Sequence, residues 1–156
     1  LNIVNAAKYH PLGQRGVCVA VKPAQYGKIF GPDYFDKMNK KTCLIAMLES
    51  TKGCENIEEI VAVEGIDVIF IGPTDLSQSL GVAGEVDHPK VEQHILEIAN
   101  IAKKSGISLG IHIYNIEDRE EIDLRIEQGF QLFTVMLDTA LFYKACTQVL
   151  NVVRTQ

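Results

Sequence analysis

Four short, almost entirely apolar runs constrain the fold of this 156-residue chain more than any other feature. They are Leu44–Leu48, Val68–Ile71, Leu109–Ile113 and Leu132–Leu137. Each run has the length of a β-strand, and continuous apolarity is typical of a parallel sheet that is covered on both faces. We therefore expect four parallel strands.

Helical patterns occupy the segments between and after these runs. The first apolar stripe at helical spacing is Val91, Ile95, Ile98, Ala99 and Ala102, and the second is Leu141, Ala145, Val149, Val152 and Val153. Gly65, Gly106 and Gly129 each stand between a helical segment and a strand, where a left-handed residue closes a helix. Asp87, just before Pro89, is expected to cap the first helix. Repeated strand–helix units predict an α/β protein with right-handed crossovers.

The first 40 residues differ, because glycines and prolines interrupt every longer pattern. We expect ordered loop there, with Val17–Val21 as a strand candidate and Tyr34–Asn39 as a helical turn. No repeat or linker divides the chain, so residues 1–156 are expected to form one domain.

Composition excludes several classes of function. The net charge of −5 does not attract nucleic acid or an anionic membrane. The apolar runs are far shorter than the ~20 residues of a membrane span, and no signal peptide is visible. The four cysteines lack C-x-x-C spacing, so we expect buried thiols in a reducing, cytoplasmic setting. Because the chain starts with Leu1 rather than Met, we expect a longer natural protein.

Two carboxylates follow neighbouring strands of the predicted sheet. Glu49 comes directly after Leu48, and Asp75 stands just after Ile71. Chemistry in parallel sheets gathers past the carboxyl ends of the strands, and Mg²⁺ or Mn²⁺ needs one or two carboxylates with waters and substrate oxygens. Taken singly, Asp75 is equally well explained as a helix cap and Glu49 as a buried ion pair; taken together, they favour a metal site.

The remaining histidines and charges are weaker candidates. His112 ends the third strand, where it either hydrogen-bonds a neighbouring loop or acts on substrate. His88 and His94 are best explained by helix packing, and the Glu117–Glu121 charges by a solvated helix face.

Several motifs together resemble one enzyme family. "LES", "VEGIDVIFIGPTDLSQSLG", "DHPKV" and the upstream "YHPLGQRGV" are similar to the HpcH/HpaI-type class II pyruvate aldolases, which are related to the 2-keto-3-deoxy sugar-acid aldolases and the citrate lyase β-type enzymes. The resemblance implies a (β/α)₈ TIM barrel of the phosphoenolpyruvate/pyruvate superfamily. The chain matches the last four strand–helix units, which are roughly the C-terminal half of that barrel.

The resemblance also implies a chemistry. Glu49 and Asp75 match the residues that bind a divalent metal, Mg²⁺ or Mn²⁺ with Co²⁺ also compatible, and the main chain around Thr74 and Asp75 meets the pyruvate carboxylate. The metal then stabilises an enolate without a Schiff-base lysine. The expected reaction is reversible aldol cleavage of a 4-hydroxy-2-oxoacid, such as a 2,4-dihydroxyhept-2-ene-1,7-dioate-like compound of aromatic catabolism or a 2-keto-3-deoxy sugar acid, to pyruvate and an aldehyde.

Assembly and completeness are further expectations from the resemblance. The family typically forms hexamers or trimers of dimers, so the last helical stripe is expected to pack on another subunit. The family's catalytic arginine and histidine lie upstream of Leu1; Arg15, His10 and His112 do not match them. A non-catalytic fragment or pseudoenzyme, and a citrate lyase β-type enzyme acting on CoA thioesters, are the alternatives. Four strands alone leave a barrel interior unfilled, which predicts that this chain does not fold stably as a monomer.

Three residues depart from the family pattern near the expected site. Met47 replaces a usual Gln, which removes one polar contact near the substrate. Met136 replaces a small Gly and is expected to crowd the floor of the site. His112 replaces an apolar residue near the aldehyde channel, where we expect it to contact substrate.

Overall fold

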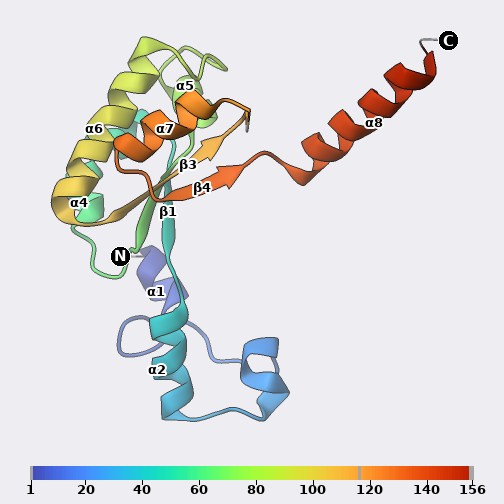
Figure 1. The fold of residues 1–156 in the computed structure, drawn as a ribbon. Coiled ribbons are helices and arrows are strands. Elements are labelled where there is room, and N and C mark those ends of the chain that lie inside the picture. Colours follow the sequence, from blue (N-terminus) through green and yellow to red (C-terminus); the bar gives the residue numbers. More distant parts are fainter. Residues whose placement is uncertain (1, 116, 155–156) are drawn as a thin grey trace.

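A computed structural model describes residues 2–115 and 117–154, and its centre is one parallel sheet (Figure 1). The strands are β1 (Ile45–Leu48), β2 (Val68–Ile71), β3 (Ser108–Ile113) and β4 (Leu132–Val135). They lie side by side in chain order, all parallel. The predicted α/β class and the four predicted strands are therefore confirmed.

Helices follow each strand, and those after β1, β2 and β3 return the chain to the start of the next strand. They are α3 (Thr51–Glu55) and α4 (Ile57–Val61) after β1, α5 (Pro73–Ser79) and α6 (Pro89–Ser105) after β2, α7 (Arg119–Glu127) after β3, and α8 (Asp138–Arg154) after β4. Figure 1 shows α4, α6 and α7 on one side of the sheet. This is the right-handed strand–helix arrangement that the alternating pattern predicts.

The core lies between that side of the sheet and α6. Ile69, Ile71 and Ile111 point into it from β2 and β3, and Ile95 and Ile98 meet them from α6, all at most 1% exposed. Alternation along a strand sends the neighbouring side chains to the opposite face.

The opposite face of the sheet differs from the sequence prediction. We expected both faces of the sheet to be covered, but Ile45 is 43% exposed and Met47 61% exposed. Phe70, His112 and Thr134 belong to the same face by register. No described helix covers this face, and its residues on β1 are exposed although Phe70 on β2 is buried. The wall of a barrel is open in this way when its inner side carries the site.

Residues 2–41 form an arm at the end of the sheet where β1 begins (Figure 1). It consists of α1 (Asn2–Ala7), the 3₁₀ turn η1 (Lys22–Gly27) and α2 (Pro32–Lys41). Buried Lys8 donates hydrogen bonds to the carbonyls of Asn39 and Thr42 at the end of α2. Asn39 also exchanges two hydrogen bonds with the backbone of Tyr9, at 2.7 and 2.9 Å. These bonds tie α1 to α2 across a long loop.

Some predicted local features of the arm and of the element ends need correction. Val17–Val21 forms no strand, because no described strand lies beside it to complete a hydrogen-bond ladder. The cap of α6 is His88, whose Nδ1 accepts from the Lys90 amide at 3.1 Å, and not Asp87, which stands one residue too early. The fourth strand ends at Val135 rather than Leu137, because Met136 has a φ of +53° and leaves the extended conformation.

Other local predictions are confirmed. Gly65, Gly106 and Gly129 all have positive φ, at 98°, 74° and 98°. The turn predicted at Tyr34–Asn39 lies inside α2. Among the described helices, none is both long and apolar enough to cross a membrane.

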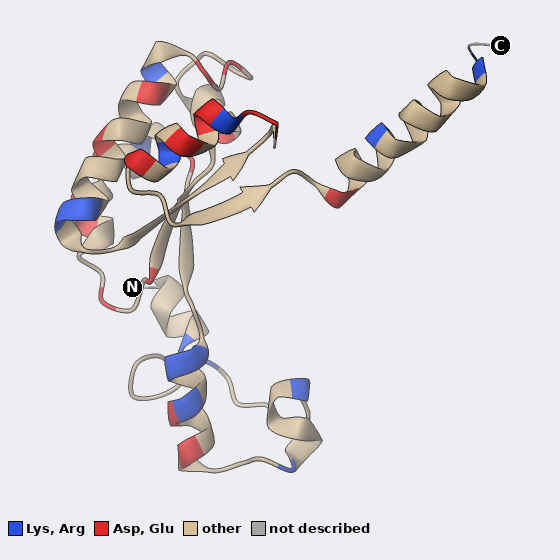
Figure 2. Cartoon of the chain, viewed as in Figure 1, with Lys and Arg blue, Asp and Glu red and all other residues tan. Residues whose placement is uncertain are grey.

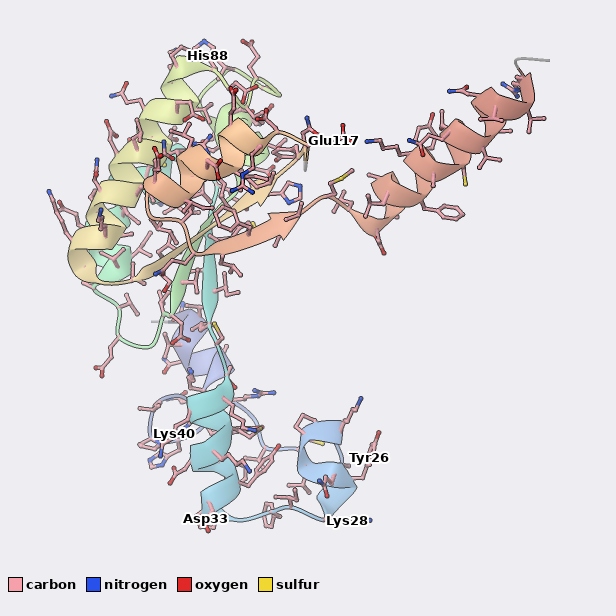
Figure 3. All side chains as sticks on the ribbon, in the orientation of Figure 1. Tyr26, Lys28, Asp33, Lys40, His88 and Glu117 are labelled. Atoms are coloured by element: carbon pink, nitrogen blue, oxygen red, sulfur yellow. The ribbon has the colours of Figure 1, made fainter. Side chains whose placement is uncertain are left out.

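Helix α8 projects away from the sheet and carries few charges along its length (Figure 2). None of its residues is buried; Leu141 is 50% exposed, Val149 64% and Val152 74%. One ion pair ties it to the body, between Lys144 Nζ and Glu117 Oε1 at 2.9 Å, and Glu117 lies between the end of β3 and α8 in Figure 3. Burial of this stripe by another subunit stays a prediction.

Candidate active site

The register of β1 and β2 brings the two predicted carboxylates to the same end of the sheet. Leu48 pairs with Ile71, so Glu49 and Gly72 follow at the same level. An ideal Cβ built on Gly72 would lie 3.3 Å from Glu49 Cβ and 3.5 Å from Glu49 Oε2. The Glu49 carboxylate therefore rests against the backbone that begins α5.

Asp75 stands in the first turn of that same helix. The N-cap of α5 is Gly72, and Pro73 occupies the first turn with no side-chain cap bond. Asp75 is therefore not the cap that its residue type alone suggested. It is exposed, as is Glu49, and neither takes part in an ion pair among the described residues. The buried-pair explanation of Glu49 is thus wrong, and both carboxylates are accessible to a ligand.

The chemistry of these donors can be compared with what different metals need. Within residues 2–115 and 117–154, no group of three or more His, Cys, Asp or Glu side chains gathers as a metal site. A closed zinc site therefore does not fit, because it needs four protein ligands. Mg²⁺ and Mn²⁺ fit, since a pair of carboxylates with water and substrate oxygens completes their octahedron. Gly72 leaves open the space that a side chain would take from Glu49.

A cavity of about 540 Å³ lies on the uncovered face of the sheet and is lined by Asp75 and by Gly72, the residue on which Glu49 packs. Glu49 itself lines a smaller cavity of about 200 Å³ at β1. The apolar lining of the larger cavity comes from the strands and includes Met47 and Phe70. The polar lining gathers at the carboxyl ends of β2, β3 and β4, and it consists of Thr74, Asp75, His112, Tyr114 and Thr134. An apolar pocket with a few converging polar groups is the usual form of a small-molecule site.

Four of those polar side chains contact one another, through two hydrogen bonds and one ring contact. His112 Nδ1 lies 2.8 Å from Thr134 Oγ1, its register partner on β4. The Tyr114 hydroxyl bonds to Thr74 Oγ1. The His112 and Tyr114 rings meet edge to face, with centroids 4.5 Å apart and planes at 78°. His112 therefore contacts a neighbouring strand rather than a loop, and it faces the cavity.

Sequence reasoning missed Tyr114 and Thr134. Both continue the period of two that places Gly110 and His112 on one face, so the signal was present. Met136 was expected to crowd the site floor, but the neighbouring Leu137 lines the cavity instead, because the positive φ at Met136 turns the chain.

The other histidines behave as helix residues, as expected. His88 caps α6, and His94 Nδ1 lies 2.8 Å from the Lys90 carbonyl oxygen. His10 and Arg15 line a separate cavity of about 590 Å³ in the arm, where the Arg15 guanidinium lies 5.0 Å from the centre of the Tyr9 ring.

The Glu117–Glu121 charges form a largely solvated face, as predicted, with Glu121 half-buried. A buried ion pair that the sequence did not predict lies next to them. Arg125 has only 5% of its side chain exposed and bonds to Glu92 across α6 and α7 at 2.5 and 2.9 Å. Glu121 lies 3.9 Å from Arg125. Burial raises the pKa of the Glu121 carboxyl, and Asp118, Asp87 and Glu92 raise that pKa further, while Arg125 lowers it.

The cysteines are all free, but three of them are exposed rather than buried: Cys18, Cys43 and Cys146. The fourth, Cys54, is half-buried against the core, and burial raises the pKa of its thiol to about 11.

Comparisons with known proteins agree with this arrangement. A 5-keto-4-deoxy-D-glucarate aldolase from Escherichia fergusonii is 40% identical over 111 residues, covering 71% of this chain and 43% of the relative. An HpcH/HpaI aldolase from Desulfitobacterium hafniense superposes on 98% of this chain and 58% of its own, with a TM-score of 0.83 and 28% identity. An HpcH/HpaI aldolase/citrate lyase family protein from Burkholderia cenocepacia superposes on 97% of this chain and 58% of its own, with a TM-score of 0.82 and 32% identity.

These matches show how much of its relatives the chain covers and to which family it belongs. The chain spans less than half of the curated aldolase and somewhat more than half of each solved structure. Its four-stranded sheet is one part of the α/β barrel fold of these enzymes. The sequence profile of the family described as HpcH/HpaI aldolase/citrate lyase matches residues 1–145. The chain therefore belongs to the HpcH/HpaI aldolase/citrate lyase family.

Proposed function

We propose that the protein is a metal-dependent carbon–carbon lyase that cleaves a 4-hydroxy-2-oxoacid reversibly to pyruvate and an aldehyde. The observation that carries the proposal is the pairing of Glu49 and Asp75 at adjacent strand ends, beside a cavity whose polar groups face the same opening. Family membership supports the reaction class, and the similarity to 5-keto-4-deoxy-D-glucarate aldolases supports a sugar-acid type of substrate.

Glu49 and Asp75 would hold a divalent cation, Mg²⁺ or Mn²⁺, through their carboxylates. When bound, such an ion supplies Lewis-acid polarisation of the ketoacid carbonyl. Glu49 is pre-positioned for this task because its carboxylate packs on Gly72, and Asp75 because it sits in the first turn of a helix. An octahedral ion keeps coordination positions for substrate oxygens when only two protein carboxylates bind it.

The start of α5 provides a place for the ketoacid carboxylate. The first amide groups of a helix have no acceptor within the helix, and here they belong to the turn that contains Thr74 and Asp75. The Tyr114 hydroxyl bonds to the Thr74 side chain and so fixes this turn against β3. The backbone around Thr74 and Asp75 therefore orients the carboxylate while the carbonyl faces the carboxylate pair.

His112 serves the aldehyde end of the substrate. Its Nδ1 is occupied by Thr134, which orients the ring and leaves Nε2 for the hydroxyl oxygen of the scissile aldol. Met47 and Phe70 line the apolar part of the cavity and exclude water from the reacting carbons.

The test is an assay of pyruvate release from a 4-hydroxy-2-oxoacid by the protein as its gene encodes it. We expect activity that EDTA abolishes and that Mg²⁺ or Mn²⁺ restores. Glu49→Gln and Asp75→Asn are each expected to lower kcat/KM by at least about 100-fold, because each removes a charged ligand. Glu58→Gln, which changes an exposed glutamate on α4, is the matched control and should leave activity unchanged.

Two outcomes would contradict the proposal. Cleavage that persists in EDTA would exclude the metal-dependent reaction. A folded protein that binds the metal but cleaves no hydroxyoxoacid would instead favour the pseudoenzyme alternative.

A further inference from the structure

Tyr114 separates two cavities that lie on opposite sides of β3. The first is the cavity of about 540 Å³ that Asp75 and His112 line. The second, of about 460 Å³, lies outside the sheet between the start of α6, the loop after β3 and α7. Among the residues that the structure describes, Tyr114 alone lines both cavities. Its side chain therefore forms the wall between them.

This wall is held on two sides. The Tyr114 hydroxyl bonds to Thr74 at the start of α5, and the edge of its ring meets the His112 ring at 78°. The residue is 45% exposed, so packing alone does not fix it. The hydrogen bond and the ring contact hold it between the carboxyl ends of β2 and β3, directly beside the residues that we assign to the two ends of the substrate.

The outer cavity has a strongly acidic lining. Four carboxylates line it, from Asp87, Glu92, Asp118 and Glu121, against the single guanidinium of Arg125. That guanidinium is already bonded to Glu92 and Gln128. Four carboxylates against one guanidinium give the lining an excess of acidic groups, which repels an added carboxylate. The cavity is therefore suited to a neutral or cationic chain and unsuited to a carboxylate.

We propose that Tyr114 is a specificity-determining residue that limits the length of the aldehyde acceptor, and that the acidic cavity behind it rejects acceptors with a distal carboxylate. The proposal rests on the lyase function proposed above. The intact protein would accept short aldehydes. Removal of the ring would let a longer neutral chain pass into the outer cavity, whereas a chain of equal length that ends in a carboxylate would still be excluded.

The test compares acceptors of matched length in pyruvate aldol addition: propanal, hexanal and 6-oxohexanoate. In Tyr114→Ala we expect the kcat/KM ratio of hexanal to propanal to rise on the order of tenfold or more, because a new apolar space distinguishes chains by their methylenes. The kcat/KM ratio of 6-oxohexanoate to propanal should not rise. Tyr114→Phe keeps the ring and its contact with His112 but loses the bond to Thr74, so its ratio should lie between those of the parent and Tyr114→Ala. Asp87→Asn in the alanine background should relax the rejection of 6-oxohexanoate.

A binding measurement separates this inference from the proposed reaction. The affinities of hexanamide and hexanoate, measured by ligand-observed NMR, show whether a ligand can pass Tyr114. They do so whether or not the protein catalyses the aldol reaction. We expect Tyr114→Ala, or Tyr114→Val if the alanine variant does not fold, to bind hexanamide about tenfold more tightly than the parent does and to discriminate against hexanoate. Equal binding by parent and variant, or equal gains for both ligands, would overturn the inference. Loss of all aldol activity with this binding pattern intact would overturn only the lyase function.

Discussion

Replacement of Gly72 by alanine tests how closely the metal site depends on the contact between Glu49 and the start of α5. Gly72 has φ −101° and ψ 90°, which alanine adopts without strain. The new methyl group would lie 3.3 Å from Glu49 Cβ, 3.5 Å from Glu49 Oε2 and 3.8 Å from Met47 Sδ. The first of these contacts is closer than ordinary van der Waals packing, so the Glu49 side chain must move by a few tenths of an ångström.

Folding and metal binding should respond in opposite directions. Because the backbone conformation suits alanine, the free energy of unfolding should stay the same or rise by about 0.4–1 kcal/mol. That increase corresponds to a rise in Tm of at most about 4 °C for a chain of this size. The metal site is less tolerant, since Mg²⁺ requires near-ideal octahedral geometry. A displaced ligand should weaken binding by about 10–100-fold, as changes next to metal ligands do.

The assay is a Mn²⁺ titration followed by electron paramagnetic resonance, together with a thermal melt of the same samples. Gly53→Ala, in α3, is the matched control: its methyl group would meet Leu48 Cγ and Ser50 Oγ at 3.4 Å, and no Glu49 atom is among its three nearest contacts. It should leave Mn²⁺ affinity unchanged. Parent-like affinity in Gly72→Ala, with an unchanged melt, would refute the reasoning.

Three further predictions concern groups outside the site. At pH 8, an alkylating reagent should modify the exposed Cys18 well before Cys54, whose pKa of about 11 against an ordinary 9.0 leaves about 100-fold less thiolate; equal rates would contradict this. The raised pKa of Glu121 means that the folded state binds its proton more tightly than the unfolded state, so stability should fall as pH rises through the window above the ordinary value of 4.5. Glu121→Gln should remove that part of the slope in melts recorded from pH 4 to 7. Because Leu141 and Val149 on α8 are exposed, changing both to Ser should lower the oligomer size measured by light scattering; an unchanged mass would contradict a role for α8 in assembly.

The sheet was predictable because each of its strands is a continuous run of apolar residues. Continuous apolar runs such as Val68–Ile71 have few alternatives to a buried parallel strand, and Val68, Ile69, Phe70 and Ile71 are indeed all buried. Val17–Val21 is also apolar but has no described strand beside it. The sequence of a segment alone does not show whether another strand will pair with it. Local apolarity therefore predicts strands well only where the surrounding chain supplies a sheet.

The site was predictable in part for a related reason. Glu49 and Asp75 follow directly from strand ends, so their common edge could be inferred from chain order alone. Tyr114 required the exact register of β3 and the placement of the first turn of α5, because its partner Thr74 is 40 residues away. The buried pair of Arg125 with Glu92 joins two helices that no motif links, so only packing shows it.

The central claim is that Glu49 and Asp75 together bind one catalytic divalent cation. A Mn²⁺ titration of the protein as its gene encodes it, repeated with Glu49→Gln, Asp75→Asn and both changes together, tests this most directly. We expect one Mn²⁺ per chain, a loss in affinity of at least about 100-fold in each single variant, and little further loss in the double variant, because both residues serve one ion. Parent-like stoichiometry and affinity in both single variants would contradict the account.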